Sequence, residues 1–168
     1  MFSHLTKVHL QQWINENRQD WGQRRHIWDD SDFSAFVTIG PNTRRDFHIN
    51  PGDEFFYQIE GELNLHYMKA QGQREVAVVG PGEVFLLPAG VPHSPRREAG
   101  SWTLAVERKA HPGEVHHTHW YCEQCNGKLY AVSRAYGEPQ GPTEQALAAL
   151  RADEKLRTCR KCGYISVY

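Results

Sequence analysis

The middle of the chain, from about residue 28 to about residue 107, is a series of short apolar runs that end at glycine or proline. Strands of this length and spacing, with turn residues between them, are typical of an all-β sandwich or small barrel. With 168 residues the chain is long enough to enclose a hydrophobic core in one such barrel. The predicted strands are Phe33–Ile39, Phe55–Ile59, Leu63–Met68, Glu75–Val79, Val84–Leu87 and Trp102–Glu107.

A helix is predicted before the β-rich region. Apolar residues recur at three- and four-residue intervals between Leu10 and Trp21, which indicates an amphipathic helix over about residues 9–19. Trp13 and Trp21 give this helix more apolar surface than one barrel covers, and we therefore expect a homodimer.

A C-terminal segment follows the β-rich region. The run His111-Pro112-Gly113 predicts a linker, so residues 1–110 are expected to form the barrel with its N-terminal helix and residues 111–168 a separate segment. In that segment Pro142 suits the first position of a helix, which is predicted over about residues 143–157.

Charge and hydropathy narrow the class of protein. A net charge of −1 offers no basic surface to a phosphate backbone, so no nucleic-acid partner is expected. The first five residues contain no apolar signal segment, and no run approaches the roughly 18 apolar residues of a membrane span. We therefore expect a cytoplasmic protein with no membrane contact.

Two stretches carry the strongest functional signal. The first is His48-Ile49-Asn50-Pro51-Gly52-Asp53-Glu54, which is followed by Gly61. The second runs from Gly82 to His93 and matches the pattern G-x5-P-x-G-x2-H at every fixed position. These stretches resemble the two motifs of the cupin superfamily. The resemblance implies an all-β fold, the double-stranded β-helix barrel of the cupins.

The cupin resemblance also implies a metal site. A Pro51-Gly52 turn would let His48 and Glu54 aim at one point inside the barrel, and His93 would reach it from another strand. Asn50 stands where cupins usually have a further histidine, which leaves two imidazoles and one carboxylate. Such a facial triad keeps coordination positions open and is typical of oxygen-activating iron(II). We expect Fe2+ at this site and not the three-histidine centre of a thiol dioxygenase.

Three charged residues are placed to surround the metal. Arg44 lies four residues before His48 and Arg97 four residues after His93, and even spacing keeps side chains on one face of a strand. Glu107 ends an apolar strand, where an acid is unexpected. Arginines near iron would suit a small anionic substrate, because a guanidinium binds a carboxylate through two hydrogen bonds. Surface ion pairs explain the same spacing equally well.

A more specific resemblance covers about residues 10–168. The sequence is similar to that of the 3-hydroxyanthranilate 3,4-dioxygenase family, including the cysteine-bearing tail of its bacterial members. The runs that carry this resemblance are Gly40-Pro41-Asn42-Thr43-Arg44-Arg45-Asp46-Phe47-His48, Glu54-Phe55-Phe56-Tyr57-Gln58, Phe85-Leu86-Leu87-Pro88, Val91-Pro92-His93-Ser94-Pro95-Arg96-Arg97 and Val106-Glu107-Arg108.

This resemblance implies an activity. His48, Glu54 and His93 would hold the catalytic iron, Arg97 would bind the substrate carboxylate, and Arg44 would lie beside the oxygen site. The implied catalytic and substrate-binding residues are Arg44, Glu54, Arg97 and Glu107. With O2, an aromatic amino-hydroxy acid would be opened to 2-amino-3-carboxymuconate semialdehyde, which closes to quinolinate. The implied setting is tryptophan catabolism through the kynurenine pathway, or NAD biosynthesis.

Some positions depart from the family pattern. The run Gly22-Gln23-Arg24-Arg25-His26 replaces a Gly-Asn-basic pattern, Phe47 stands where tyrosine is common, and Arg96 where glutamine is common. A substituted 3-hydroxyanthranilate therefore remains an alternative substrate, as does another ortho-aminophenol acid. A third alternative is a non-catalytic cupin that senses a small carboxylate, although a sensor has no need of open iron positions.

Four cysteines form the second constellation. They occur as two Cys-x-x-Cys pairs, Cys122 with Cys125 and Cys159 with Cys162. In a reducing compartment such pairs indicate a tetrahedral metal site rather than disulfides. Sulfur ligation suits iron or zinc, and the resemblance to the bacterial dioxygenases implies a rubredoxin-like iron. A thioredoxin-like site would need an α/β context, and a nucleic-acid zinc ribbon would need basic flanks.

Histidines also gather in the C-terminal segment, at His111, His116, His117 and His119. A third metal site is one interpretation of this cluster. We expect a solvated histidine-rich linker instead.

Overall fold

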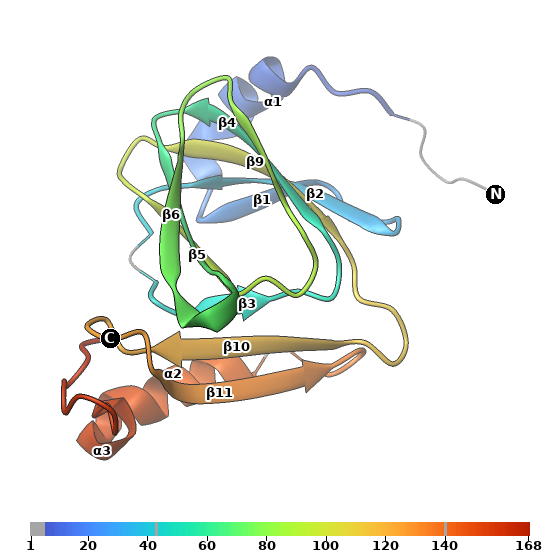
Figure 1. The fold of residues 1–168 in the computed structure, drawn as a ribbon. Helices are drawn as coiled ribbons and strands as arrows, with labels where there is room; N and C mark the ends of the chain where they lie inside the picture. The colour runs from blue at the N-terminus through green and yellow to red at the C-terminus, as the bar shows by residue number, and fades with distance from the viewer. Residues whose placement is uncertain (1–5, 43, 140) are drawn as a thin grey trace.

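The computed structural model describes residues 6–42, 44–139 and 141–168; residues 1–5, Thr43 and Gln140 lie outside this description, as do the N-terminal residues on which the absence of a signal segment was judged. Two antiparallel sheets face each other and close a barrel (Figure 1). The five-stranded sheet has the order β1-β2-β9-β4-β7 and the six-stranded sheet the order β11-β10-β3-β8-β5-β6.

The strands are β1 (Arg24–Trp28), β2 (Phe33–Ile39), β3 (Phe47–Ile49), β4 (Glu54–Glu60), β5 (Leu63–Met68), β6 (Arg74–Val79), β7 (Val84–Leu87), β8 (His93–Arg97), β9 (Trp102–Arg108), β10 (Val115–Tyr121) and β11 (Lys128–Ala135). The helices are α1 (Leu10–Asn17), the 3-10 turns η1 (Arg18–Asp20) and η2 (Ala70–Gly72), α2 (Pro142–Ala152) and α3 (Glu154–Arg157). The all-β prediction is confirmed, and each of the six predicted strands is present to within one residue at either end.

Both predicted helices are confirmed. The N-terminal helix is α1 continued by η1, and the C-terminal one begins at Pro142. The latter is divided into α2 and α3 at Asp153, which has an extended backbone and whose side chain accepts a hydrogen bond from the backbone N–H of Lys155. Asp153 thus caps the N-terminus of α3, which explains the break.

The expectation of a solvated histidine-rich linker is wrong for Val115–Tyr121. These residues form β10, which pairs with β11 and, through His117 opposite Ile49 and Thr118 opposite His48, with β3. The predicted His111-Pro112-Gly113 linker does lie in a loop, which connects β9 to β10. Strands β10 and β11 close one end of the barrel, with α2 against their outer side (Figure 1).

The hydrophobic core lies in three main clusters. One fills the barrel and includes Phe36, Phe56, Leu65 and Leu87. The second packs α1 against the five-stranded sheet, and the third packs α2 against β10 and β11 through Trp120, Ala146 and Leu150.

The tryptophans of the N-terminal region pack within the chain. Trp21 is 4% exposed, contacts the rings of Trp13 and Trp102 edge-on at 5.0 Å, and donates a hydrogen bond to the carbonyl oxygen of Val37. The apolar surface that suggested a homodimer is therefore covered by the barrel itself. That argument for a dimer is wrong, and the dimer stays a prediction.

Among the described residues, no helix combines the length and the apolar character that crossing a membrane requires.

Two neighbouring leucines on β7 offer a matched test of the barrel core. Leu87 is 3% exposed and Leu86 is 60% exposed, because successive side chains on a strand face opposite sides. We expect Leu87→Ala to lower the free energy of unfolding by about 2–5 kcal/mol, through lost burial and a cavity. Leu86→Ala should change the free energy of unfolding of the monomer by less than about 0.5 kcal/mol, at concentrations too low for two copies to associate. Urea denaturation checks both values, and equal losses would contradict this core.

Candidate active site and cysteine metal centre

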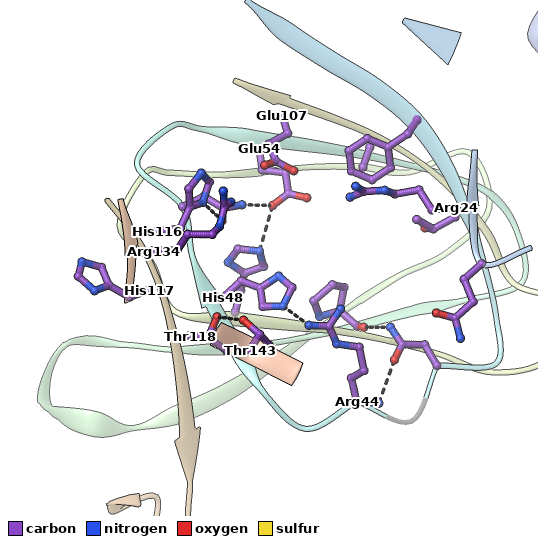
Figure 2. A pocket seen from close by; sticks show the side chains of 18 of the residues that line it. Arg24, Arg44, His48, Glu54, Glu107, His116, His117, Thr118, Arg134 and Thr143 are labelled. Carbon is purple, nitrogen blue, oxygen red and sulfur yellow. Dashed lines mark hydrogen bonds and ion pairs between the residues drawn. The ribbon is translucent and has the colours of Figure 1, made fainter. Parts of the chain in front are cut away.

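A cavity of about 360 Å³ opens between the two sheets beneath β10 and β11. All six residues that the sequence placed at the catalytic site line it: Arg44, His48, Glu54, His93, Arg97 and Glu107. Figure 2 shows Glu54 and Glu107 close together at one wall, with Arg44 at the opposite wall and Arg24 reaching in from the side. The volume falls within the range of small-molecule sites.

Glu54 and His93 meet inside the barrel. They come from different sheets, through β4 and β8, and the Oε2 atom of Glu54 lies 2.9 Å from Nε2 of His93. The Nδ1 atom of His93 is 3.0 Å from the carbonyl oxygen of Val91, which fixes the ring and leaves Nε2 facing the cavity. Burial opposes charge on both groups. Their mutual hydrogen bond outweighs this effect of burial, so the pKa of Glu54 is lowered and the pKa of His93 is raised.

His48 lies on the neighbouring strand, directly opposite His93 in the register of β3 and β8. Its Nε2 atom does not face Glu54: it lies 2.8 Å from Oδ2 of Asp46 and beside the guanidinium of Arg44. Asp46 is 6% exposed and bonds Arg44 as well. Burial works against the charge of Asp46, but its bonds to His48 and Arg44 hold its pKa well below the usual range.

Asp46 is a site residue that the sequence reasoning missed. The same even spacing that placed Arg44 beside His48 also places Asp46 on that face, so the signal was present. Its carboxylate occupies His48 and Arg44 together and sets the direction of both side chains.

A short turn places His48 and Glu54 on one cavity. Gly52 in this turn approaches Arg108 so closely that an added Cβ would lie 2.7 Å from the Arg108 Cβ atom. The guanidinium of Arg108 in turn donates to the carbonyl oxygen of Pro51 and pairs with Glu114. Only glycine allows this contact, which supports the role expected for the Pro51-Gly52 turn.

Asn50, where cupins usually have histidine, is 9% exposed. Its side-chain N–H donates to Glu54 Oε2 at 3.2 Å, and its carbonyl oxygen lies 3.3 Å from Nδ1 of His116 on β10. The amide therefore orients the carboxylate of Glu54.

The donor set fits iron(II). Two imidazoles and a carboxylate line one cavity, and the Glu54–His93 pair is already assembled. Within the part of the chain that the structure describes, only the four cysteines bring three or more candidate ligand atoms within 4.8 Å of one another. The assignment of His48, Glu54 and His93 as iron ligands stays a prediction, because His48 is turned toward Asp46.

Arg97 is held deep in the cavity. It is 6% exposed, and its Nε–H donates to Oγ1 of Thr103 at 2.9 Å, while Thr103 donates to Gln58. Burial lowers the pKa of the Arg97 guanidinium to about 10, which still leaves it charged at neutral pH. The guanidinium can therefore bind an anion, while its Nε–H is held by the hydroxyl of Thr103.

Glu107 faces Glu54 across the pairing of β4 and β9. Burial, followed by the negative charge of Glu54, raises the pKa of Glu107 to about 7, although Arg24 and Arg134 partly offset this. An acid that is half protonated at neutral pH can both donate and accept a hydrogen bond within the cavity.

The C-terminal segment supplies a wall of the cavity that the sequence reasoning missed. The added lining residues include Arg24 from β1 and His116, Thr118, Arg134 and Thr143 from beyond residue 110 (Figure 2). The hydroxyls of Thr118 and Thr143 lie 3.2 Å apart, which ties β10 to the start of α2. The alternation of β10 could have revealed this wall, but its histidines masked the strand pattern.

The cysteine centre is assembled as predicted, with no disulfide. The Sγ atoms of Cys122 and Cys162 are 3.7 Å apart and those of Cys125 and Cys159 are 3.5 Å apart. The backbone N–H of Asn126 donates to the carbonyl oxygen of Cys122, and that of Gly163 donates to the carbonyl oxygen of Cys159. Both donor residues have a positive φ. Four converging thiols fit a tetrahedral metal site.

The chain is similar in sequence to known proteins over most of its length. A model of the 3-hydroxyanthranilic acid dioxygenase family matches residues 1–136. The chain is 40% identical over 164 residues to 3-hydroxyanthranilate 3,4-dioxygenase of Bacillus cereus, covering 96% of this chain and 92% of that one. It is 36% identical over 170 residues to the enzyme of the same name from Paraburkholderia phytofirmans, covering 98% and 97%.

A solved cupin-2 domain protein from Shewanella frigidimarina superposes with a TM-score of 0.49 at 20% identity, over 61% of this chain and 94% of that one. The family match and the two curated relatives decide the assignment. The chain belongs to the 3-hydroxyanthranilic acid dioxygenase family.

Proposed function

We propose that the protein is a non-haem iron(II) 3-hydroxyanthranilate 3,4-dioxygenase, which opens the ring with O2 to give 2-amino-3-carboxymuconate semialdehyde, the precursor of quinolinate. One observation carries the proposal: a single cavity, in a chain of this family, is lined by all the predicted site residues, His48 and His93, Glu54 and Glu107, and Arg44 and Arg97. The kynurenine pathway and NAD biosynthesis are the setting that this reaction implies.

The roles of the residues follow from their positions. His48, Glu54 and His93 would hold iron(II), which when bound supplies electron transfer between an ortho-aminophenol and dioxygen. Arg97 would bind the substrate carboxylate, because it is charged, buried and fixed by Thr103. Glu107 would bind a polar substituent of the ring, and Arg44, held by Asp46, would lie at the opposite wall. These contacts would orient the ring before reaction.

A substituted 3-hydroxyanthranilate is the second candidate substrate. A further hollow of about 320 Å³ adjoins the cavity and shares Arg24, Glu107, His116 and Arg134 with it. It offers space, with the guanidiniums of Arg24 and Arg134 and the ammonium of Lys109, for a ring substituent that 3-hydroxyanthranilate itself does not have.

One assay tests the activity directly. Anaerobic protein loaded with iron(II) is mixed with 3-hydroxyanthranilate, oxygen is admitted, and the ring-opened semialdehyde is followed by absorbance. Turnover supports the proposal. Its absence with iron still bound would reject unsubstituted 3-hydroxyanthranilate as the substrate, and ring-substituted analogues run in parallel separate the two candidates.

The metal assignments extend the same proposal. We propose iron at the four cysteines also, as in a rubredoxin-like centre, with zinc as the alternative that the sulfur ligands equally fit.

We also propose a homodimer, on different evidence from the tryptophans of the N-terminal helix. Phe55 and Leu86, paired on β4 and β7, and Val84 on the same face of β7 are large apolar residues exposed at the edge of the five-stranded sheet.

Substitution of one histidine separates the two metal sites. His93→Ala should lose the catalytic ion and retain the ion at the cysteines, because His93 belongs to one site alone. His119→Ala is the matched control: His119 bonds the hydroxyl of Tyr121 and should leave both ions in place. Elemental analysis with iron spectroscopy measures the occupancy of each site. Full iron content in His93→Ala would contradict the ligand assignment.

Removal of the buried arginine tests substrate binding. Arg97→Gln should weaken transition-state binding by about 2–4 kcal/mol, because a substrate carboxylate would lose its charged partner. That corresponds to a fall in kcat/KM of roughly 30- to 1,000-fold. Arg18→Gln, which removes a guanidinium from an exposed pair with Glu60, should leave kcat/KM unchanged. Equal values in both variants would remove Arg97 from the substrate site.

A further inference from the structure

Glu123 lies in the loop between the cysteines of the first pair and is the meeting point of three arginines. Its carboxylate oxygens are 3.0 Å from Nη1 of Arg74, 3.3 Å from Nη1 of Arg45 and 3.7 Å from Nη2 of Arg96. We call these four residues the Glu123 cluster.

The arginines of the Glu123 cluster come from separate parts of the barrel. Arg45 precedes β3, Arg74 begins β6, and Arg96 lies on β8. Arg74 also donates to the carbonyl oxygen of Cys122 at 3.4 Å, and its guanidinium lies 5.1 Å from the ring centroid of Phe47. The loop that carries the first cysteine pair is therefore docked on the barrel through this cluster.

The Glu123 cluster carries more positive charge than its contacts use. Three guanidiniums face one carboxylate, which leaves an excess of two positive charges. The side chains of Arg74, Arg96 and Glu123 are only 12%, 19% and 17% exposed, whereas that of Arg45 is 46% exposed. Buried nitrogen atoms of Arg74 and Arg96 have no hydrogen-bond acceptor among the described residues. Such an excess is costly when it is partly buried and uncompensated.

Neighbouring groups do not supply the missing negative charge. Burial raises the pKa values of the neighbouring Tyr121 and Tyr168, so both hydroxyls are neutral at pH 7. His66 on β5 is a further titratable neighbour, and burial, followed by the charges of Arg96 and Arg74, lowers its pKa to about 4. It is neutral at pH 7 and adds nothing to the balance.

The cysteine centre has the complementary charge. Four thiolates that bind one divalent cation carry two net negative charges, and Glu123 is the residue next to Cys122.

We propose that Arg45, Arg74 and Arg96 are positioning residues that balance the charge of a divalent metal ion bound by the four cysteines, with Glu123 holding them together. Metal binding and docking of the cysteine loop on the barrel then stabilise each other, because linked equilibria are reciprocal. The inference does not depend on the ring-cleaving activity.

Cobalt titration of three variants tests the inference. Co2+ is followed by thiolate-to-metal charge-transfer absorbance, which reports only ions bound by cysteine. Arg96→Gln should lower the affinity by at least about fivefold, the lower end of typical coupling between sites. Arg96→Lys keeps the charge and should retain most of the affinity. Lys69→Gln removes a positive charge from the β5–β6 hairpin, which also carries Arg74. Lys69 pairs with Glu75 instead of Glu123, so this change should not alter the Co2+ affinity.

Salt and hydrogen exchange separate charge balance from a general loss of structure. Raising the ionic strength should weaken Co2+ binding in the parent more than in Arg96→Gln, because the parent has more charge to screen. Amides of β8 should gain protection on Co2+ binding in the parent, and less in Arg96→Gln. Far-UV circular dichroism confirms that the variants are folded. Equal Co2+ affinity in Arg96→Gln and Lys69→Gln would overturn the proposal, as would equal losses in Arg96→Gln and Arg96→Lys.

Discussion

The contact between Glu54 and His93 inside the barrel is the interaction on which the site depends. It joins β4 of one sheet to β8 of the other, with both side chains less than 10% exposed. Taking an acid and an imidazole out of water costs several kcal/mol, and a pair of apolar residues of similar size would pack there at no such cost. A site of this kind is maintained for what it binds. Its surroundings agree, since Asn50 orients Glu54 and the carbonyl of Val91 orients His93.

Both acidic and cationic side chains line the cavity around this pair. Glu54 and Glu107 oppose each other in neighbouring strands, and that proximity, after burial, raises the pKa of Glu107. Arg97 on the same cavity remains charged although it is buried. Arginines and glutamates therefore line the same cavity, and a mixed lining of this kind suits the proposed aromatic acid with a second polar substituent.

The C-terminal segment contributes both to the cavity and to the four-cysteine cluster. Strand β10 pairs with β3 beside His48 and contributes cavity residues, and the cysteine pair follows directly at its end. The Glu123 cluster joins the same cysteine loop to β6 and β8. A barrel without residues 111–168 would lack a wall of its cavity as well as the second metal centre.

Much of this arrangement was predictable from the sequence, and the misses have physical causes. Strands such as β2, β5 and β7 were predicted correctly because each is an apolar run that ends at turn residues. Five strands were missed, namely β1, β3, β8, β10 and β11. In β1, β3, β8 and β10, histidines, arginines or a proline interrupt the apolar pattern. Spacing also cannot show rotation about a side chain. The turn of His48 toward Asp46 and the burial of Trp21 both depend on contacts between distant segments.

We propose that His48, Glu54 and His93 bind one iron ion and leave part of its coordination sphere free. A crystal structure of the iron-loaded protein, with anomalous scattering measured at the iron edge, tests this most directly. We expect a peak bounded by these three side chains, with His48 turned from Asp46 toward the metal. A peak at the cysteines alone, or a fourth protein ligand that fills the open positions, would contradict it.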